Sequence, residues 1–129
     1  YPDPKSKIYP PETLIIVALL HDICKANCYH TEKRNAKENG AWVEKQVYVF
    51  EDELPLGHGE KSLYLASKFI KLSDEEAAAI RWHMGAFDNA FRGGDRGLNA
   101  AYEKYPLAVM LHLADMRATY LLERGDRHD

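Results

Sequence analysis

The sequence lacks any apolar run long enough to cross a lipid bilayer. Its longest apolar run, residues 14–20, reads LIIVALL, whereas a membrane-spanning helix needs about 20 such residues. Nothing at the N-terminus resembles the charged and apolar regions of a signal peptide. These absences argue against a membrane-spanning or secreted protein, and they predict a cytoplasmic location.

Cysteine is also scarce. Cys24 and Cys28 are the only two in the chain, and their four-residue spacing near an expected helix end suits reduced thiols better than a structural disulfide. Together with His30 they resemble part of a zinc site, but no fourth ligand is apparent. We therefore expect ordinary buried or half-buried thiols.

No charge of one sign dominates the composition. The 129 residues include 17 basic and 20 acidic ones, a formal net charge of −3, and the two signs are mixed along the chain. This balance gives no electrostatic argument for nucleic acid as an obligatory partner, although small anionic substrates can still bind at local basic residues. The length predicts one domain over residues 1–129, and 46% apolar residues suffice for an ordinary core.

Apolar residues recur at helical spacing through most of the chain, which predicts an all-α fold. We expect helices over residues 11–25, 59–71, 73–85 and 98–104, and from residue 106 onward. The first of these is apolar around most of its circumference, which predicts a buried central helix. Ser73 and Glu76 have the spacing of a capping box and are expected to open the third helix.

Residues 28–55 have a different character. Apolar residues alternate with polar ones between Trp42 and Phe50, and Asn39-Gly40 is a common turn sequence. This pattern predicts a small β-hairpin inserted between helices. Its loop is expected to exceed the two-residue minimum, which leaves the strand register open.

Four positions near expected helix ends carry side chains that hold divalent ions. His21-Asp22 places an imidazole beside a carboxylate at the end of an apolar helix, where burying both without partners would be costly. Asp115 interrupts a similarly apolar helix, and His58 and His83 lie at further helix ends. Each has an ordinary alternative as a cap, an ion-pair member or a core residue. Their combination favours a single metal site.

Several segments, in their order and spacing, resemble the HD-domain superfamily of metal-dependent phosphohydrolases. They are ALLHDICK at residues 18–25, GHG at 57–59, IRWH at 80–83 and LAD at 113–115. The resemblance covers nearly the whole chain, is closest to bacterial members with extra histidines, and implies a helical bundle. It also implies that His21, Asp22 and Asp115 are core metal ligands, with His58 and His83 as additional ligands for a second ion.

The chain departs from the family pattern in two ways. The pattern begins with a further histidine on an earlier helix, and no histidine precedes His21 here. Either the natural protein continues upstream of Tyr1 or this ligand is absent, and we expect a missing N-terminal helix because the chain opens without an initiator methionine. The hairpin is not a general part of the superfamily, so a lid, a dimer contact and a decoration are all open alternatives.

Basic residues near the predicted metal site are candidates for binding substrate. Lys25 lies one turn after the His-Asp pair, and the resemblance implies contact with a substrate phosphate, although a lysine there also stabilises the helix dipole. Asp22 and Lys25 are therefore the expected catalytic residues. Lys61 and Arg117 are further substrate-binding candidates, with solvated surface as the alternative. His112 fits a supporting or packing role better than that of a ligand.

The expected activity is hydrolysis of a phosphate ester, a nucleotide or an oligonucleotide, with one or two divalent ions as cofactors. Fe, Mn, Ni, Co and Mg all suit ligands of these types. Asp22 is expected to bridge the ions where two bind, because carboxylates bridge readily. The rival interpretations are a non-catalytic HD-like module that binds a nucleotide or a partner protein, and a purely structural helical domain. No membrane partner is expected.

Overall fold

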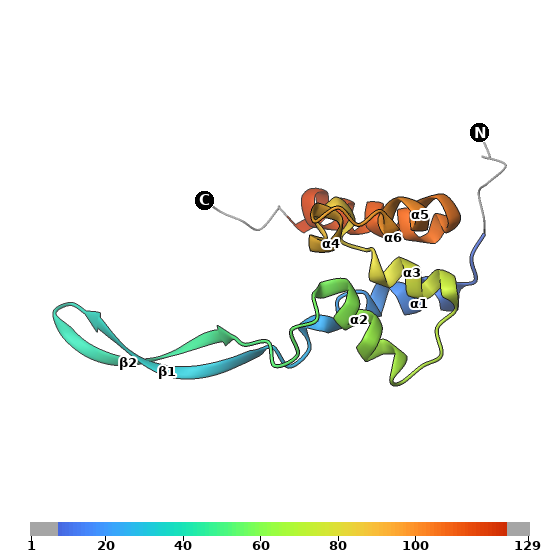
Figure 1. Ribbon diagram of the computed structural model, residues 1–129. Coiled ribbons are helices and arrows are strands. Elements are labelled where there is room, and N and C mark those ends of the chain that lie inside the picture. The colour runs from blue at the N-terminus through green and yellow to red at the C-terminus, as the bar shows by residue number, and fades with distance from the viewer. Residues whose placement is uncertain (1–7, 124–129) are drawn as a thin grey trace. The chain divides into compact units, whose positions relative to one another are not determined.

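The computed structural model describes residues 8–123 and divides the chain into two compact units (Figure 1). Residues 8–24 and 56–123 form the helical unit, and Lys25–Pro55 form the hairpin unit. No helix within residues 8–123 is long and apolar enough to cross a membrane.

The helical unit consists mainly of α-helices, as the sequence predicts. They are α1 (Pro11–Leu20), α2 (His58–Ser67), α3 (Asp74–Arg81), α4 (Asn89–Arg92), α5 (Gly97–Lys104) and α6 (Pro106–Arg117). Short 3₁₀ turns lie at Ile23–Lys25 and Gly85–Phe87, and a π-helical turn, Ala118–Leu122, continues α6. Strands β1 (Tyr29–Glu38) and β2 (Ala41–Phe50) form an antiparallel pair. The predicted helical fold with a hairpin is therefore confirmed in outline.

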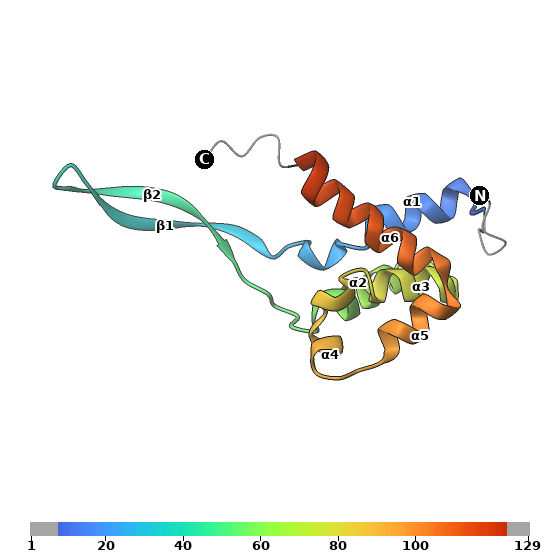
Figure 2. The same ribbon diagram turned by 90° about the horizontal axis from the view of Figure 1, so that it is seen from above.

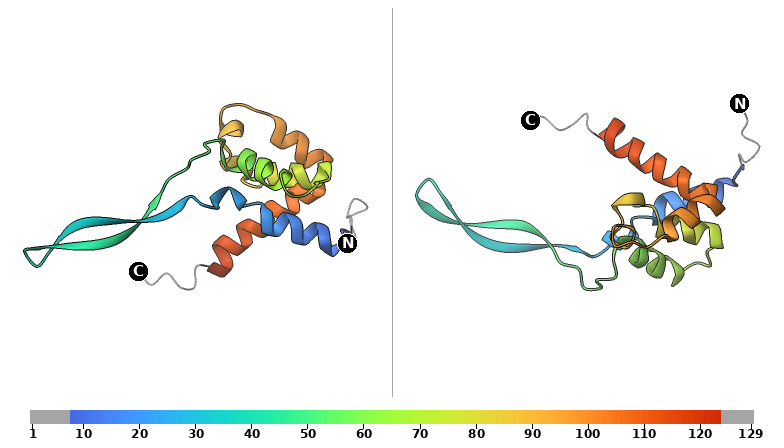
Figure 3. Two further views of the ribbon diagram at one scale, coloured as in Figure 1. Left: turned by 90° about the horizontal axis from the view of Figure 1, so that it is seen from below. Right: turned by 45° about the horizontal axis from the view of Figure 1, so that its top comes forward.

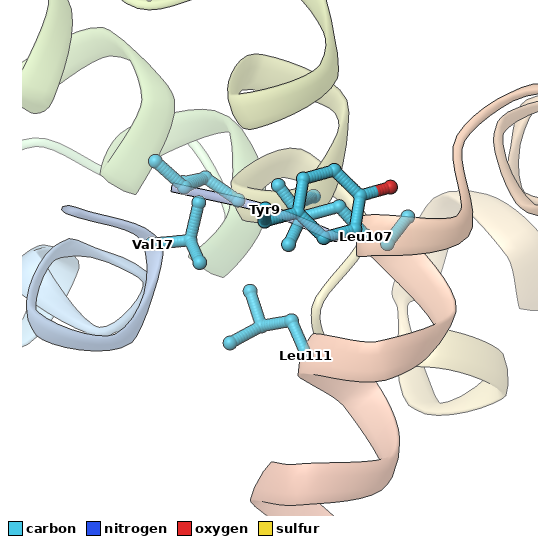
Figure 4. Close-up of a cluster of buried hydrophobic side chains, with 7 residues drawn as sticks. Tyr9, Val17, Leu107 and Leu111 are labelled. Atoms are coloured by element: carbon cyan, nitrogen blue, oxygen red, sulfur yellow. The ribbon is translucent and has the colours of Figure 1, made fainter. Parts of the chain in front are cut away.

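The α3 helix provides the centre of the hydrophobic core. It contacts α1, α2 and α6 (Figures 1 and 2), and its Ala79 and Ile80 are completely buried. Val17 of α1 and Leu107 and Leu111 of α6 belong to the same cluster (Figure 4). Burying an aliphatic side chain contributes about 1.5–3 kcal/mol, so these contacts hold together helices that are distant in sequence.

The prediction that the first helix is central and buried is wrong for the described chain. Only Val17 of α1 is fully buried, whereas Leu14, Ile15 and Leu19 are 41%, 57% and 73% exposed. An apolar circumference shows that a helix can be buried on any side, but the number of neighbouring helices decides how many sides are covered. The helix also ends at Leu20 rather than at residue 25.

The capping box at the start of α3 is confirmed. Ser73 Oγ accepts a hydrogen bond from the Glu76 backbone N–H at 3.2 Å, and Glu76 Oε1 accepts one from the Ser73 N–H at 2.9 Å. This reciprocal pair satisfies two N–H groups that have no partner within the helix. The helix ends at Arg81, four residues before the predicted end.

The α2 helix is also shorter than predicted, and it ends at Ser67 rather than at residue 71. The Lys68 N–H donates to Leu65 O and the Phe69 N–H to Ala66 O, which is the tighter 3₁₀ pattern common at helix ends. Phe69, just beyond the helix, is 80% exposed.

The hairpin has a two-residue loop, which corrects the expectation of a longer one. Its register pairs Glu38 with Ala41 across Asn39 and Gly40, whose φ angles of 50° and 80° are those of a type I′ turn. Because this turn matches the twist of paired strands (Figure 3), the mostly polar residues 34–38 of β1 pair with residues 41–45 of β2. At the open end of the hairpin, the rings of Tyr29 and Phe50 pack in a T-shaped arrangement with their centroids 5.3 Å apart.

Tyr9 connects the segment before α1 to α3. Its hydroxyl donates to Glu75 Oε1 at 2.5 Å, and burial, followed by the hydrogen bond and negative charge of Glu75, raises the pKa of Tyr9 to about 12. Because the folded pKa exceeds the unfolded value, the resulting stabilisation is complete below about pH 10 and is lost as the pH rises through about 12.

The free energy of unfolding of the wild type should therefore fall between about pH 10 and pH 12. We expect a smaller fall in Tyr9→Phe, because phenylalanine has no hydroxyl group to ionise. Urea unfolding across this range measures the decrease. Tyr29→Phe is the matched control. Because Tyr29 is 61% exposed, its substitution should leave the pH profile unchanged. Parallel profiles for Tyr9→Phe and the wild type would contradict the assignment.

Candidate metal centre

His21 and Asp22 occupy the turn that follows α1. His21 is the C-cap of the helix, and its backbone N–H donates to Val17 O at 3.1 Å. Its Nδ1 lies 2.7 Å from Ala18 O, which accepts a hydrogen bond when Nδ1 carries the proton. The other ring nitrogen, Nε2, lies 3.6 Å from Asp22 Oδ2. The end of the helix thus orients the imidazole towards the carboxylate.

His83 is placed in a similar way just after α3. Its Nδ1 lies 2.7 Å from Ile80 O, and its Nε2 lies 3.3 Å from Asp22 Oδ1. The side chain is completely buried, and within the described residues its Nε2 has no hydrogen-bond partner. The His21 and His83 rings meet edge to face, with centroids 5.1 Å apart.

Asp115 approaches the same point from α6. Its Oδ1 lies 3.8 Å from His21 Nε2. Three separate segments therefore bring together His21, Asp22, His83 and Asp115, which we call the His-Asp cluster. The side chains of His21, Asp22 and Asp115 are 16%, 40% and 32% exposed, so the cluster has one buried side and one side open to solvent.

The chemistry of the cluster favours a cation. When Nδ1 of His21 and of His83 donates to a carbonyl oxygen, each Nε2 presents a lone pair towards carboxylate oxygens that are also acceptors. Lone pairs facing one another at 3.3–3.8 Å repel unless a proton or a metal ion lies between them. Hydrogen bonding of the second ring nitrogen to a carbonyl is also how metal-binding histidines are usually oriented. The residues present therefore fit a divalent ion.

The spacing of the donor atoms supports this fit. Two atoms that bind one ion at about 2.0–2.2 Å lie about 2.8–3.6 Å apart in octahedral or tetrahedral geometry. Two of the distances, 3.3 and 3.6 Å, fall in this range, and the third, 3.8 Å, is slightly longer. Residues 8–123 contain no group of three or more His, Cys, Asp or Glu side chains already gathered in metal-binding geometry. Small side-chain movements would therefore accompany binding.

His112 supports the cluster from behind. Its Nδ1 lies 2.8 Å from the backbone oxygen of His83, in agreement with the supporting role expected from the sequence. Gly85 makes room for this ring, because a Cβ atom there would lie 2.5 Å from His112 Cε1, and its φ angle of 56° favours glycine. Sequence reasoning missed Gly85, although a glycine two residues after a candidate ligand was a usable signal.

The structure does not bring His58 into the His-Asp cluster. The side chain is exposed, and its Nδ1 lies 3.4 Å from Cys24 Sγ. Cys24 is held in place by its backbone N–H, which donates to Ser62 Oγ at 3.1 Å. The sequence indicated a functional histidine at this helix start but could not show which side of the helix it would occupy.

The basic candidates are placed in three different settings. Lys61 is buried, with 5% exposure, so the alternative of solvated surface is wrong for this residue. Arg117 is exposed at the end of α6. Lys25 belongs to the hairpin unit. The roles of the three residues in binding substrate remain predictions.

Both cysteines are buried and neither forms a disulfide, as expected. The partial zinc site considered for them with His30 is not formed in the described part of the chain. His30 Nε2 instead lies 3.2 Å from Glu32 Oε1 and 3.6 Å from Glu51 Oε2.

Comparison with known proteins identifies one family. The model of the HD domain family matches residues 7–119, which include every member of the His-Asp cluster. No curated protein and no solved structure matches the sequence significantly. The family match spans most of the chain, and the chain belongs to the HD domain family.

Proposed function

We propose that this protein is a metal-dependent phosphohydrolase that acts on a phosphate ester. The observation that carries the proposal is the pair of imidazoles whose Nδ1 atoms lie against carbonyl oxygens while their Nε2 atoms lie against carboxylates. Membership of the HD domain family supports it, because metal-dependent hydrolases are common in that family.

His21 and His83 would hold the metal through Nε2, and Asp22 and Asp115 through carboxylate oxygens. Asp22 is the proposed bridge where two ions bind, since its two oxygens lie towards different histidines. When bound, a divalent ion would supply polarisation of a phosphoryl oxygen and activation of water. Fe, Mn, Ni, Co and Mg are all compatible with these donors.

The remaining predicted residues have proposed roles in binding substrate. Lys25, Lys61 and Arg117 would contact the phosphate or its flanking groups, with Lys25 next to the reacting phosphate as a second catalytic residue. His58 would join the site as an additional ligand if its ring turned away from Cys24. We propose a nucleotide or oligonucleotide as substrate and a cytoplasmic setting.

The first test measures metal binding. We expect chelator-treated protein to bind Mn²⁺ with a rise in thermal midpoint, because an ion that binds only the folded state stabilises it. His21→Ala should weaken binding on the order of a hundredfold, as expected for a lost ligand. His30→Ala is the matched control, since its imidazole lies in the hairpin unit beside Glu32. Equal affinity for wild type and His21→Ala would contradict the proposed centre.

Turnover distinguishes the enzyme from the second candidate function, a non-catalytic HD-like module that binds a nucleotide or a partner protein. The position of His58 outside the cluster favours this alternative, because the donor set is smaller than the sequence predicted. Metal-loaded protein that releases phosphate from phenyl phosphate, ethyl phosphate or a nucleotide supports the enzyme. Metal binding without turnover of any ester supports the module.

A further inference from the structure

A pocket of about 190 Å³ lies in the helical unit between the start of α2 and residues 84–90. Much of its wall is apolar, contributed by Leu56, Met84, Phe87 and Ala90. Leu56 and Phe87 are 43% and 57% exposed, so a ligand could cover apolar surface that now meets water. Burying such surface is favourable at about 25 cal/mol per Å².

The charged residues of the pocket are already paired with each other through Arg81. Its two terminal nitrogens lie 2.7 Å from Glu60 Oε1 and 2.8 Å from Asp88 Oδ2. Asp88 also accepts a hydrogen bond from the Ala90 N–H at 2.9 Å. Two carboxylates and one guanidinium leave one net negative charge, which disfavours an anion. The pocket is therefore unsuited to a phosphate group.

The uncharged groups suit the edge of a ring. Asn89 contributes an amide and His58 an imidazole to the lining, and both can donate or accept hydrogen bonds. The volume selects the size of the ligand, because a cavity of about 150 Å³ holds benzene, whereas drug-sized ligands need about 300 Å³ or more. The pocket can therefore accept one ring but not a whole nucleotide.

Two residues that line the pocket, Met84 and His58, connect it to the His-Asp cluster. Met84 directly follows His83 in the chain, so their Cα atoms are about 3.8 Å apart. On the other side, His58 Nδ1 lies 3.4 Å from the thiol of Cys24, which is two residues beyond Asp22. A small phosphate ester bound at the cluster could thus place its organic part in the pocket.

We propose that this pocket binds the uncharged ring of the alcohol part of the substrate, an aromatic or heteroaromatic ring, while the phosphate lies at the His-Asp cluster. The proposal rests on the proposed function and assigns this pocket to the ring of its phosphate-ester substrate. In hydrolysis the water oxygen ends on phosphorus and the P–O bond to the ring-bearing group breaks. The departing oxygen keeps the bonding electron pair and gains a proton from the water, so the products are a ring-bearing alcohol and phosphate.

The kinetic test uses a variant that fills the pocket and leaves the residues of the His-Asp cluster unchanged. Ala90→Leu adds a side chain to the lining, and Ala100→Leu makes the same change at an exposed position on α5. We expect Ala90→Leu to lower kcat/KM for phenyl phosphate at least about tenfold, because the ring loses its binding surface. Activity on ethyl phosphate should change less than about twofold, and Ala100→Leu should behave as wild type on both. Equal losses on the two esters would overturn the proposal.

A binding measurement separates the pocket from the proposed function. Phenol, which carries the ring without the phosphate, should shift the NMR signal of the Met84 methyl group saturably on the order of millimolar. Met110 and Met116 serve as internal controls, and Ala90→Leu should remove the Met84 shift. Saturable binding in a protein that hydrolyses no ester would support the pocket while refuting the hydrolase. Absence of a saturable shift at Met84 would overturn the pocket whatever the activity.

Discussion

Replacing Asp115 with alanine should lower metal-dependent hydrolysis of phosphate esters by at least about a hundredfold while leaving the protein folded. The substitution removes a carboxylate oxygen that lies 3.8 Å from His21 Nε2, and loss of one group that organises charge at a reacting centre typically costs about 10²–10³ in kcat. Stability of the metal-free protein should hardly fall, because the change also removes a half-buried charge near Asp22.

Two further variants test whether the loss of activity is due to the carboxylate of Asp115. Asp115→Asn keeps an oxygen but loses the charge, so we expect residual activity that rises with metal concentration. Glu103→Ala removes an exposed carboxylate from α5 and should retain wild-type kinetics. Circular dichroism and urea unfolding check the fold of each variant. Full activity of Asp115→Ala on every ester that the wild type hydrolyses would rule out Asp115 as a ligand.

Replacing Gly59 with alanine should cost about 3 kcal/mol or more of unfolding free energy. A Cβ atom at this position would overlap the backbone oxygen of Arg81 and lie 2.9 Å from its carbonyl carbon. The first turn of α2 would therefore have to move away from the end of α3. That movement would also disturb the ion pairs of Arg81 with Glu60 and Asp88.

Urea unfolding measures the effect, and Gly93→Ala is its control. Gly93 follows α4 with a φ angle of −82°, which alanine adopts readily, and the nearest atom to its added Cβ is 3.3 Å away. We expect this control to lie within about 1 kcal/mol of the wild type. Wild-type stability of Gly59→Ala would mean that α2 and α3 do not approach as closely as described.

Helix ends illustrate how far local sequence could predict the candidate site. His21, Asp22 and His83 were all expected near helix ends, and each lies just beyond one. The carbonyl oxygens exposed at such ends accept hydrogen bonds from imidazole nitrogens, as Ala18 and Ile80 do here. His58 occupies the predicted helix start but lies beside Cys24, because the direction of a side chain depends on neighbours from distant segments.

The sequence by itself determined those features that depend on neighbouring residues. The capping box at Ser73 and the turn at Asn39-Gly40 follow from backbone chemistry within four residues, and the helical class follows from apolar spacing. The tertiary structure alone decided that α3 rather than α1 occupies the centre, and that His58 lies beside Cys24 rather than in the His-Asp cluster. Both depend on how segments far apart in the chain pack against one another. The free energy of burial depends on the apolar area that this packing covers, and local composition does not determine that area.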